Sequence, residues 1–114
     1  MKGINSLENS INLIKTNDNE KNRGIMRKMV KSILNSDNRL YKEYLYDIYF
    51  NSIKNNNITI VNILIDSEID VDAFDEYGNT GLHYAIYYNR VNIVMILLQN
   101  DIIYISYKYS LYNL

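Results

Sequence analysis

An internal repeat constrains the fold of this chain more than any other feature. When the sequence is shifted by 33 residues, one segment falls on like residues of the next without a gap. The matched pairs are Ile53 and Ile86, Asn56 and Asn89, Ile60 and Ile93, Val61 and Val94, Ile63 and Ile96, and Leu64 and Leu97. A period of this length is typical of supersecondary units that stack into a solenoid. The repeat therefore favours helix over strand for residues 58–65, where apolar spacing alone fits both.

The second copy carries a longer motif. Residues 75–85 read D-E-Y-G-N-T-G-L-H-Y-A and closely resemble the D-x-x-G-x-T-P-L-H-x-A segment of ankyrin repeats. Residues 69–73 resemble the link that precedes this segment in the family, and the apolar positions of residues 91–98 match its second helix. The resemblance implies an all-α solenoid of helix pairs with short β-hairpin-like turns, and protein binding as the function.

The residues of the motif have identifiable physical roles. Gly78 suits a tight turn that needs positive φ, and Asn89 replaces the family's glycine at a left-handed helix end. Thr80 is placed to cap the first helix of the repeat through its hydroxyl. The side chains that we expect to face the neighbouring repeat are Leu82, Ala85 and Ile86.

Departures from the family define the domain organisation. Gly81 stands where the family has proline, which should loosen the first helical turn by adding unfolded-state entropy. In the first copy Asp47, Tyr49 and Phe50 replace the threonine, leucine and histidine of the motif, so this copy is degenerate. The predicted regions are an N-terminal helical cap region (1–38), a degenerate repeat (39–73), an ankyrin repeat (74–106) and a C-terminal tail (107–114).

Local patterns predict the remaining elements. Apolar spacing predicts helices within residues 4–14, 25–34 and 40–55, with a polar linker over 16–23. The first two helices should stack as a cap, because a solenoid repeat cannot bury its own apolar face. Alternation over residues 103–111 predicts a C-terminal strand. That strand would fold over the last repeat or leave an exposed edge. A third reading is that the chain is a truncated relative of a longer ankyrin protein.

Composition narrows the classes of function. The formal net charge is −1, so no overall field recruits nucleic acid or an anionic membrane. Without cysteine and with one histidine, the chain offers no thiolate zinc site, and we expect no cofactor. No apolar run approaches the roughly 20 residues that span a bilayer, and no signal peptide is visible. We therefore expect an intracellular, cytoplasmic protein. The excess of Asn, Ile, Lys and Tyr indicates an AT-rich genome, such as that of a poxvirus, another large DNA virus, or an AT-rich parasite or protist.

Three features could carry chemistry, and each has a structural explanation. His83 has no partner for a catalytic triad, and the resemblance implies that it supports the turn by hydrogen bonding. The acidic residues between 66 and 76 span a loop and do not have the spacing of a calcium-binding EF-hand. Basic residues between 21 and 31 could bind nucleic acid, but a solvated helix face explains them as well.

Tyrosines supply the candidate binding site. The resemblance implies binding through hairpin tips and the exposed side of first helices, at the variable positions of the motif. Tyrosine buries a large area at low entropic cost, which is why interfaces favour it. The predicted protein-binding residues, on one concave stripe, are Glu76, Tyr77, Asn79, Tyr87 and Tyr88, with Tyr44, Tyr46 and Lys54 from one period earlier. Codon drift onto an exposed face is the competing explanation.

These observations favour a non-enzymatic module that sequesters or tethers a host or cellular protein. If the source is a poxvirus, the resemblance implies a host-range or immune-evasion adaptor. One alternative is a structural protein that self-associates by stacking its open C-terminal face on a second copy. Another is a remnant of a longer ankyrin protein, which would unfold with poor cooperativity. No small-molecule substrate is expected.

Overall fold

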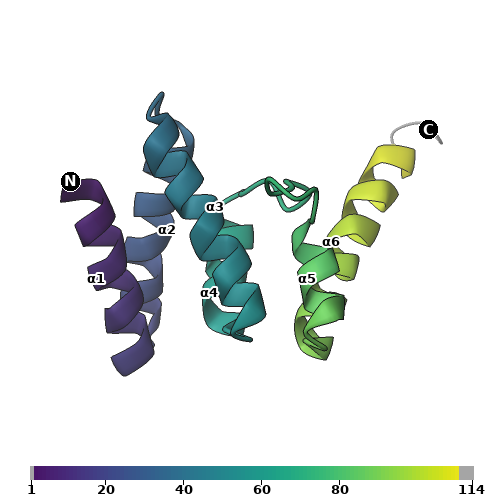
Figure 1. Cartoon of the computed structure of the whole chain (residues 1–114), viewed down its shortest axis with the longest axis horizontal. Helices are drawn as coiled ribbons and strands as arrows, with labels where there is room; N and C mark the ends of the chain where they lie inside the picture. The colour runs from purple at the N-terminus through teal and green to yellow at the C-terminus, as the bar shows by residue number, and fades with distance from the viewer. Residues whose placement is uncertain (1, 111–114) are drawn as a thin grey trace.

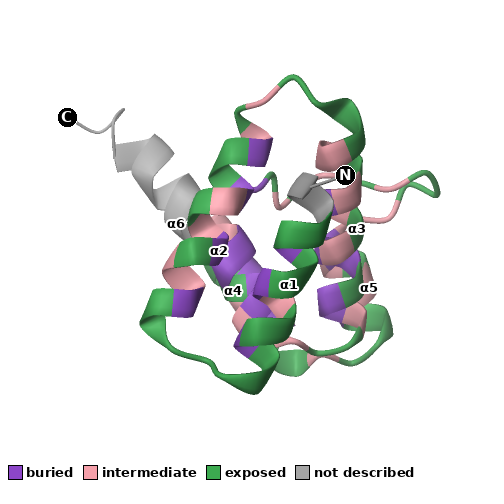
Figure 2. Cartoon of the chain, turned by 90° about the vertical axis from the view of Figure 1, so that its left-hand side faces the viewer, coloured by how far each residue is buried: buried purple, intermediate pink, exposed green. Residues whose placement is uncertain are grey.

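Helix pairs form the architecture. The computed structural model describes the backbone of residues 2–110 and the side chains of residues 5–101. The helices in this range are α1 (Lys2–Thr16), α2 (Glu20–Leu34), α3 (Arg39–Lys54), α4 (Ile58–Asp66), α5 (Gly81–Tyr87) and α6 (Val91–Ser110). Figure 1 shows three pairs in succession: α1 with α2, α3 with α4, and α5 with α6. Seen from the N-terminal end, α3 and α5 lie on one side and α2, α4 and α6 on the other (Figure 2). This is the all-α solenoid that the sequence predicted.

A single hydrophobic core runs through all three pairs, and the pair of α3 and α4 contributes more of its residues than either of the other pairs. Tyr49 of α3 is the largest fully buried side chain. Its hydroxyl donates to the carbonyl of Val71, 3.1 Å away, which satisfies the one polar group that this ring brings into the core. Burial, followed by the nearby charge of Asp72, raises the pKa of Tyr49. The degenerate copy therefore supplies a core residue at one of the positions where it departs from the motif.

Asparagines begin and end several helices. The side chains of Asn19, Asn38 and Asn57 cap α2, α3 and α4 by accepting a backbone N–H from the first helical turn. Each such cap contributes about 1 kcal/mol. Asn56 and Asn89, one period apart, both have a φ of 56°. The left-handed conformation expected at Asn89 is thus confirmed, and these asparagines have structural roles beyond codon drift.

The linker expected over residues 16–23 is shorter in the structure. α1 ends at Thr16 and α2 already begins at Glu20. Asn22, which looked like part of a polar linker, is buried and donates its amide N–H to the carbonyl of Asn17 at 2.8 Å. The prediction of a linker over the whole stretch was wrong, because polar composition hid a capped helix start.

The C-terminal strand is replaced by helix. Residues 103–110, where alternation predicted a strand, belong to α6, which extends to Ser110. No Gly, Pro or Asn lies between residues 101 and 110 to end the helix, so the helical run continues through the alternating stretch. Leu111 and the last residues of the predicted tail lie outside the described residues.

The loop between α4 and α5 forms the expected hairpin-like turn. Phe74 and Thr80 form an isolated antiparallel bridge, and Gly78 at the turn has a φ of 80°. The positive φ confirms the role predicted for this glycine. The loop projects on the same side of the molecule as α3 and α5 (Figure 2). It therefore extends the surface that the first helices of the pairs present.

Close contact between α3 and α5 explains two positions of the motif. Ala85 is fully buried and Gly81 is buried as well. A Cβ at Gly81 would lie 2.8 Å from Cζ of Tyr49 and from Cδ1 of Ile53, and closer still to the Tyr49 hydroxyl. Glycine at this position therefore makes room for Tyr49, a role that the sequence analysis missed. Ile86 is exposed, so the prediction that it contacts a neighbouring repeat was wrong for the described chain.

A hydrogen-bonded arginine joins the second and third pairs. Arg90, in the turn between α5 and α6, donates from Nε to the carbonyl of Lys54 at 2.9 Å, and its Nη2 donates to the same oxygen. Lys54 is the last residue of α3, where carbonyls lack intrahelical partners. The guanidinium satisfies this carbonyl with a charge-assisted pair of bonds.

Candidate protein-binding surface

The tip of the hairpin loop presents two predicted binding residues. Glu76 and Tyr77 lie at the turn and are exposed. Oδ1 of Asp75 accepts from the backbone N–H groups of Tyr77 and Asn79, each at 3.0 Å. These bonds hold the turn in one conformation, so a partner that docks on it need not order it first.

A side-chain hydrogen bond ties this loop to α5. The hydroxyl of Tyr84 donates to the carboxylate of Asp75. This bond, with the backbone N–H groups of Asn79 and Tyr77 and the charge of Lys54, lowers the pKa of Asp75. The same bond raises the pKa of Tyr84. Loop and helix are thus held in a fixed relation by an ionised carboxylate.

The helix start beside the loop is held by a reciprocal pair of bonds. The N–H of Thr80 donates to Nδ1 of His83 at 2.9 Å, and the N–H of His83 donates to the Thr80 hydroxyl at 3.3 Å. This capping box confirms the capping role of Thr80 and the structural role that the resemblance implied for His83.

Aromatic rings gather on the exposed side of α5. The rings of Tyr84 and Tyr88 are stacked with centroids 6.4 Å apart, and Tyr87 meets Tyr88 edge-on at 5.0 Å. Nζ of Lys54 lies 4.4 Å from the centroid of the Tyr84 ring, a cation–π distance. A hollow of about 310 Å³, called the α5 hollow below, is lined by Asn79, His83, Tyr84, Tyr87 and Tyr88. Tyr87 is 80% exposed at its edge.

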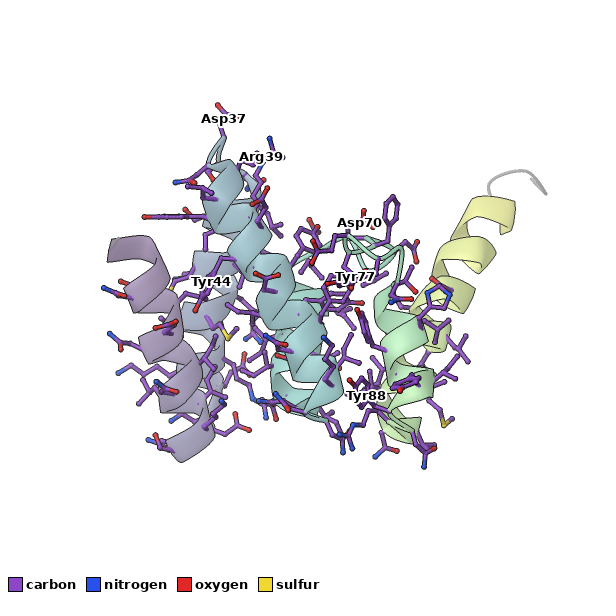
Figure 3. The ribbon with its side chains drawn as sticks, in the orientation of Figure 1. Asp37, Arg39, Tyr44, Asp70, Tyr77 and Tyr88 are labelled. Carbon is purple, nitrogen blue, oxygen red and sulfur yellow. The ribbon has the colours of Figure 1, made fainter. Side chains whose placement is uncertain are left out.

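The structure brings some predicted site residues together and separates others. Asn79, Tyr87 and Tyr88 line the α5 hollow, and Lys54 touches its edge through Tyr84. Figure 3 shows Tyr77 near the hairpin loop and Tyr88 toward the opposite end of α5. Both lie on the third helix pair and its loop, so this part of the predicted surface is continuous along one edge of the solenoid.

Tyr44 lies apart from this surface, whereas Tyr46 lines the groove between α3 and the hairpin loop. The hydroxyl of Tyr44 forms a hydrogen bond with the carboxylate of Glu8 in α1, and burial followed by this bond raises its pKa to about 12. The hydroxyl of Tyr46 accepts the backbone N–H of Asp70 at 3.2 Å. Tyr44 therefore faces α1 and Tyr46 faces the loop, so Tyr44 is left out of the single stripe predicted for all five tyrosines.

The sequence analysis missed three aromatic residues near the site. Phe50 packs edge-on against Tyr84 with centroids 5.6 Å apart, and Phe74 is exposed beside the hairpin turn. Tyr84 itself sits at a variable position of the motif, four residues before Tyr88, so helical spacing could have identified this pair. Phe50 and Phe74 carry no such signal, because their place depends on how α3 packs against the loop.

A groove between α3 and the loop is predominantly acidic. Its lining includes the predicted site residue Tyr46, the two phenylalanines and the charged residues Arg39, Lys42, Glu43, Asp47, Asp75 and Glu76. Nε of Arg39 pairs with Oε1 of Glu43 at 2.9 Å. The groove adjoins the hairpin tip, so the hollow, the tip and the groove form neighbouring parts of one surface.

The other candidate chemistries have local explanations. In the basic cluster, Arg23 pairs with Asp18, with 2.6 Å between Nε and Oδ1, and Arg27 pairs with Glu20. Among the described residues no group of three or more His, Cys, Asp or Glu side chains could hold a metal ion. None of the helices that the structure describes is long and apolar enough to cross a membrane.

Helix pairs joined by a projecting hairpin, with a Thr–His capping box at the start of α5, define a repeat protein of the ankyrin type. The family model described as "Ankyrin repeats (3 copies)" matches residues 20–108 of this chain. The chain therefore belongs to the ankyrin repeat family. The match begins at the first residue of α2, inside the region predicted as an N-terminal cap. Ankyrin repeats are protein–protein interaction modules and are typically not enzymes.

A curated ankyrin repeat protein of Fowlpox virus (strain NVSL) is similar to this chain. It is 33% identical over 69 residues, which are 60% of this chain and 48% of the viral protein. The chain therefore spans about half the length of this relative. No solved structure matches the chain.

Proposed function

We propose that the chain binds a protein partner on the surface formed by the α5 hollow and the hairpin tip. The observation that carries this proposal is the exposure of a tyrosine cluster on a rigid support. Tyr87 is 80% exposed, yet the neighbouring rings of Tyr84 and Tyr88 are stacked and Tyr84 is hydrogen-bonded to Asp75. Rigid aromatic side chains beside a concave hollow are the usual energetic centres of interfaces.

The charges around the site favour a partner segment with basic and apolar side chains. The adjoining groove carries Glu43, Asp47, Asp75 and Glu76 against two basic residues. Complementary charge of this kind steers encounter and suppresses wrong partners more than it adds affinity. The tyrosines would supply the affinity, and the carboxylates would select the partner.

The likeness to a fowlpox protein supports a viral setting for this module. In that setting the partner is a host protein that the module sequesters or tethers in the cytoplasm, in host-range control or immune evasion. A single binding surface is enough for sequestration, and a further segment or second molecule would be needed for an adaptor role.

The proposal is tested by affinity capture from lysate of vertebrate cells, followed by titration with the captured protein. The test variant carries Tyr77→Ala and Tyr87→Ala, since both side chains are exposed and their loss leaves the core unchanged. Leu40→Ala is the matched control, because Leu40 is an exposed apolar residue at the start of α3, outside the proposed surface. Circular dichroism must show that all three proteins are equally folded.

We expect the wild type and Leu40→Ala to bind the partner equally and the double variant to bind at least about 30-fold more weakly, as loss of aromatic anchors costs roughly 2 kcal/mol or more. Equal binding by the double variant would place the interface elsewhere. Capture of no specific protein by the wild type would count against a binding function for this surface.

A further inference from the structure

The groove between α3 and the hairpin loop, called the acidic groove below, has a volume of about 680 Å³. Its floor is one face of α3, on which Glu43, Asp47 and Phe50 follow one another at helical spacing. Arg39, labelled in Figure 3, lies at the start of this helix. The wall of the groove is the loop segment 73–76. Hollows of several hundred Å³ accommodate drug-sized ligands, so this one has room for a long side chain of a partner.

Two carboxylates of the acidic groove retain their capacity to accept hydrogen bonds. Glu43 is paired with Arg39, and Asp75 is bonded within the loop and to α5. Asp47 and Glu76 are exposed, and within the described part of the chain they form neither an ion pair nor a side-chain hydrogen bond. An ionised carboxylate accepts several hydrogen bonds, so both residues can bind a donor that enters the groove.

The groove stays negative after its internal pairing is counted. Of its two cations, Arg39 is neutralised by Glu43. Lys42 then stands against the three remaining carboxylates, which leaves a net charge of −2. Concave walls that carry one sign of charge concentrate the field and attract the opposite charge. The groove therefore favours a cationic side chain and disfavours an acidic segment.

An exposed aromatic ring narrows the choice of cation. Phe74 is 71% exposed, although its bridge with Thr80 fixes its place in the loop. A guanidinium is planar and weakly hydrated, so it stacks on an aromatic face while its N–H groups bond to carboxylates beside the ring. An ammonium is compact and strongly hydrated, and it gains less from the ring. A ring next to unpaired carboxylates therefore suits arginine better than lysine.

We propose that the acidic groove receives an arginine side chain of the partner, with its guanidinium stacked on Phe74 and bonded to the carboxylates of Asp47 and Glu76. This inference rests on the proposed function, because the groove adjoins the hairpin tip and would take a segment of the same partner. That segment crosses the tip and places apolar side chains on the α5 hollow. The arginine then fixes the direction in which the segment lies.

The test is fluorescence anisotropy of a labelled peptide of alternating arginine and glycine, and of its lysine counterpart of equal charge. Each is titrated with the full chain in about 50 mM salt, where screening is weak. The groove variant combines Asp47→Asn and Glu76→Gln. The matched control combines Asp66→Asn and Glu68→Gln, which removes the same charge at exposed positions outside the groove, at the end of α4. A third variant, Phe74→Leu, keeps the apolar character and removes the ring.

We expect the wild type and the control to bind the arginine peptide equally, and the groove variant at least about 10-fold more weakly, because charge-assisted bonds are lost. Phe74→Leu should remove most of the preference for arginine over lysine. Equal binding by the groove and control variants would reduce the effect to overall charge and overturn the proposal. No binding by the wild type, or equal affinity for the two peptides, would also overturn it.

The failure of this inference can be told from failure of the proposed function. If the arginine peptide binds in the groove but capture of a partner is indifferent to Tyr77→Ala and Tyr87→Ala, the tyrosine surface alone is refuted. If the captured partner depends on these tyrosines but binds the groove variant and the control equally, the arginine site alone is refuted. Circular dichroism must show that every variant is folded like the wild type.

Discussion

Replacing Gly81 with alanine should destabilise the protein, although Gly81 is the first residue of a helix. In general, replacing a helical glycine by alanine stabilises by about 0.4–1 kcal/mol through the unfolded state. Here the new Cβ would lie 2.8 Å from Cζ of Tyr49 and Cδ1 of Ile53. Tyr49 cannot move away easily, because it is fully buried and bonded to Val71. Overpacking costs about 1–3 kcal/mol, so Gly81→Ala should lose roughly 1–2 kcal/mol net.

Urea unfolding followed by circular dichroism measures this loss as a lower midpoint, and a double-mutant cycle identifies its cause. Tyr49→Leu introduces the smaller residue that the family has at this position and removes the ring atoms nearest Gly81. In that background the cost of Gly81→Ala should largely vanish, giving a coupling energy of at least about 1 kcal/mol.

Gly78→Ala is the control for the cycle. Its cost arises from a φ of 80°, with no atom within 4 Å of the new Cβ, so Tyr49→Leu should not change it. The reasoning is refuted if Gly81→Ala is as stable as the wild type, or if its cost is the same with tyrosine and with leucine at position 49.

Three further predictions concern caps and charge. Asn57→Ala should lower the stability by about 1 kcal/mol through loss of the α4 cap, and Asn57→Asp should not; equal thermal midpoints for both would contradict the cap. Asn89→Val should destabilise by about 1–2 kcal/mol in urea unfolding because of its positive φ, whereas Asn89→Gly should be tolerated; similar losses for both would contradict this. Because the pKa of Asp75 is lowered in the folded state, its carboxylate stabilises the fold above the unfolded pKa of about 4, and this contribution is lost as pH falls below it. Asp75→Asn should therefore reduce the loss of stability between about pH 5 and pH 3, and an unchanged pH profile would argue against the bond to Tyr84.

Much of the fold could be predicted from the sequence because its determinants are local or periodic. The 33-residue shift aligned Ile53 with Ile86 and identified the repeat. The roles of Gly78, Thr80 and Asn89 follow from backbone conformation and capping, which depend on near neighbours along the chain. These predictions needed no knowledge of how one pair packs on the next.

The parts that failed depend on contacts between distant segments or on helix rotation. Gly81 could be understood only once Tyr49, 32 residues earlier, was placed against it. The exposure of Ile86 depends on whether a further helix pair covers it. The separation of Tyr44 from Tyr46, in contrast, could have been predicted from the sequence. Side chains two residues apart on a helix are rotated by roughly 200° about its axis. Helical geometry alone already argued against one stripe for both.

The bond between Arg90 and the carbonyl of Lys54 bears on the order in which this molecule opens. The third pair has a neighbour on one side only in the described chain, so in a linear array it is the first candidate to detach. The guanidinium of Arg90 holds the third pair to the end of α3 by bonding to the carbonyl of Lys54. The side chain of Lys54 also contacts the ring of Tyr84. Lys54 thus contacts both Arg90, which attaches the last pair, and Tyr84, which lines the α5 hollow. A molecule that loses this clamp would lose the hollow before the first two pairs unfold, so binding would fail while most of the helical signal remained.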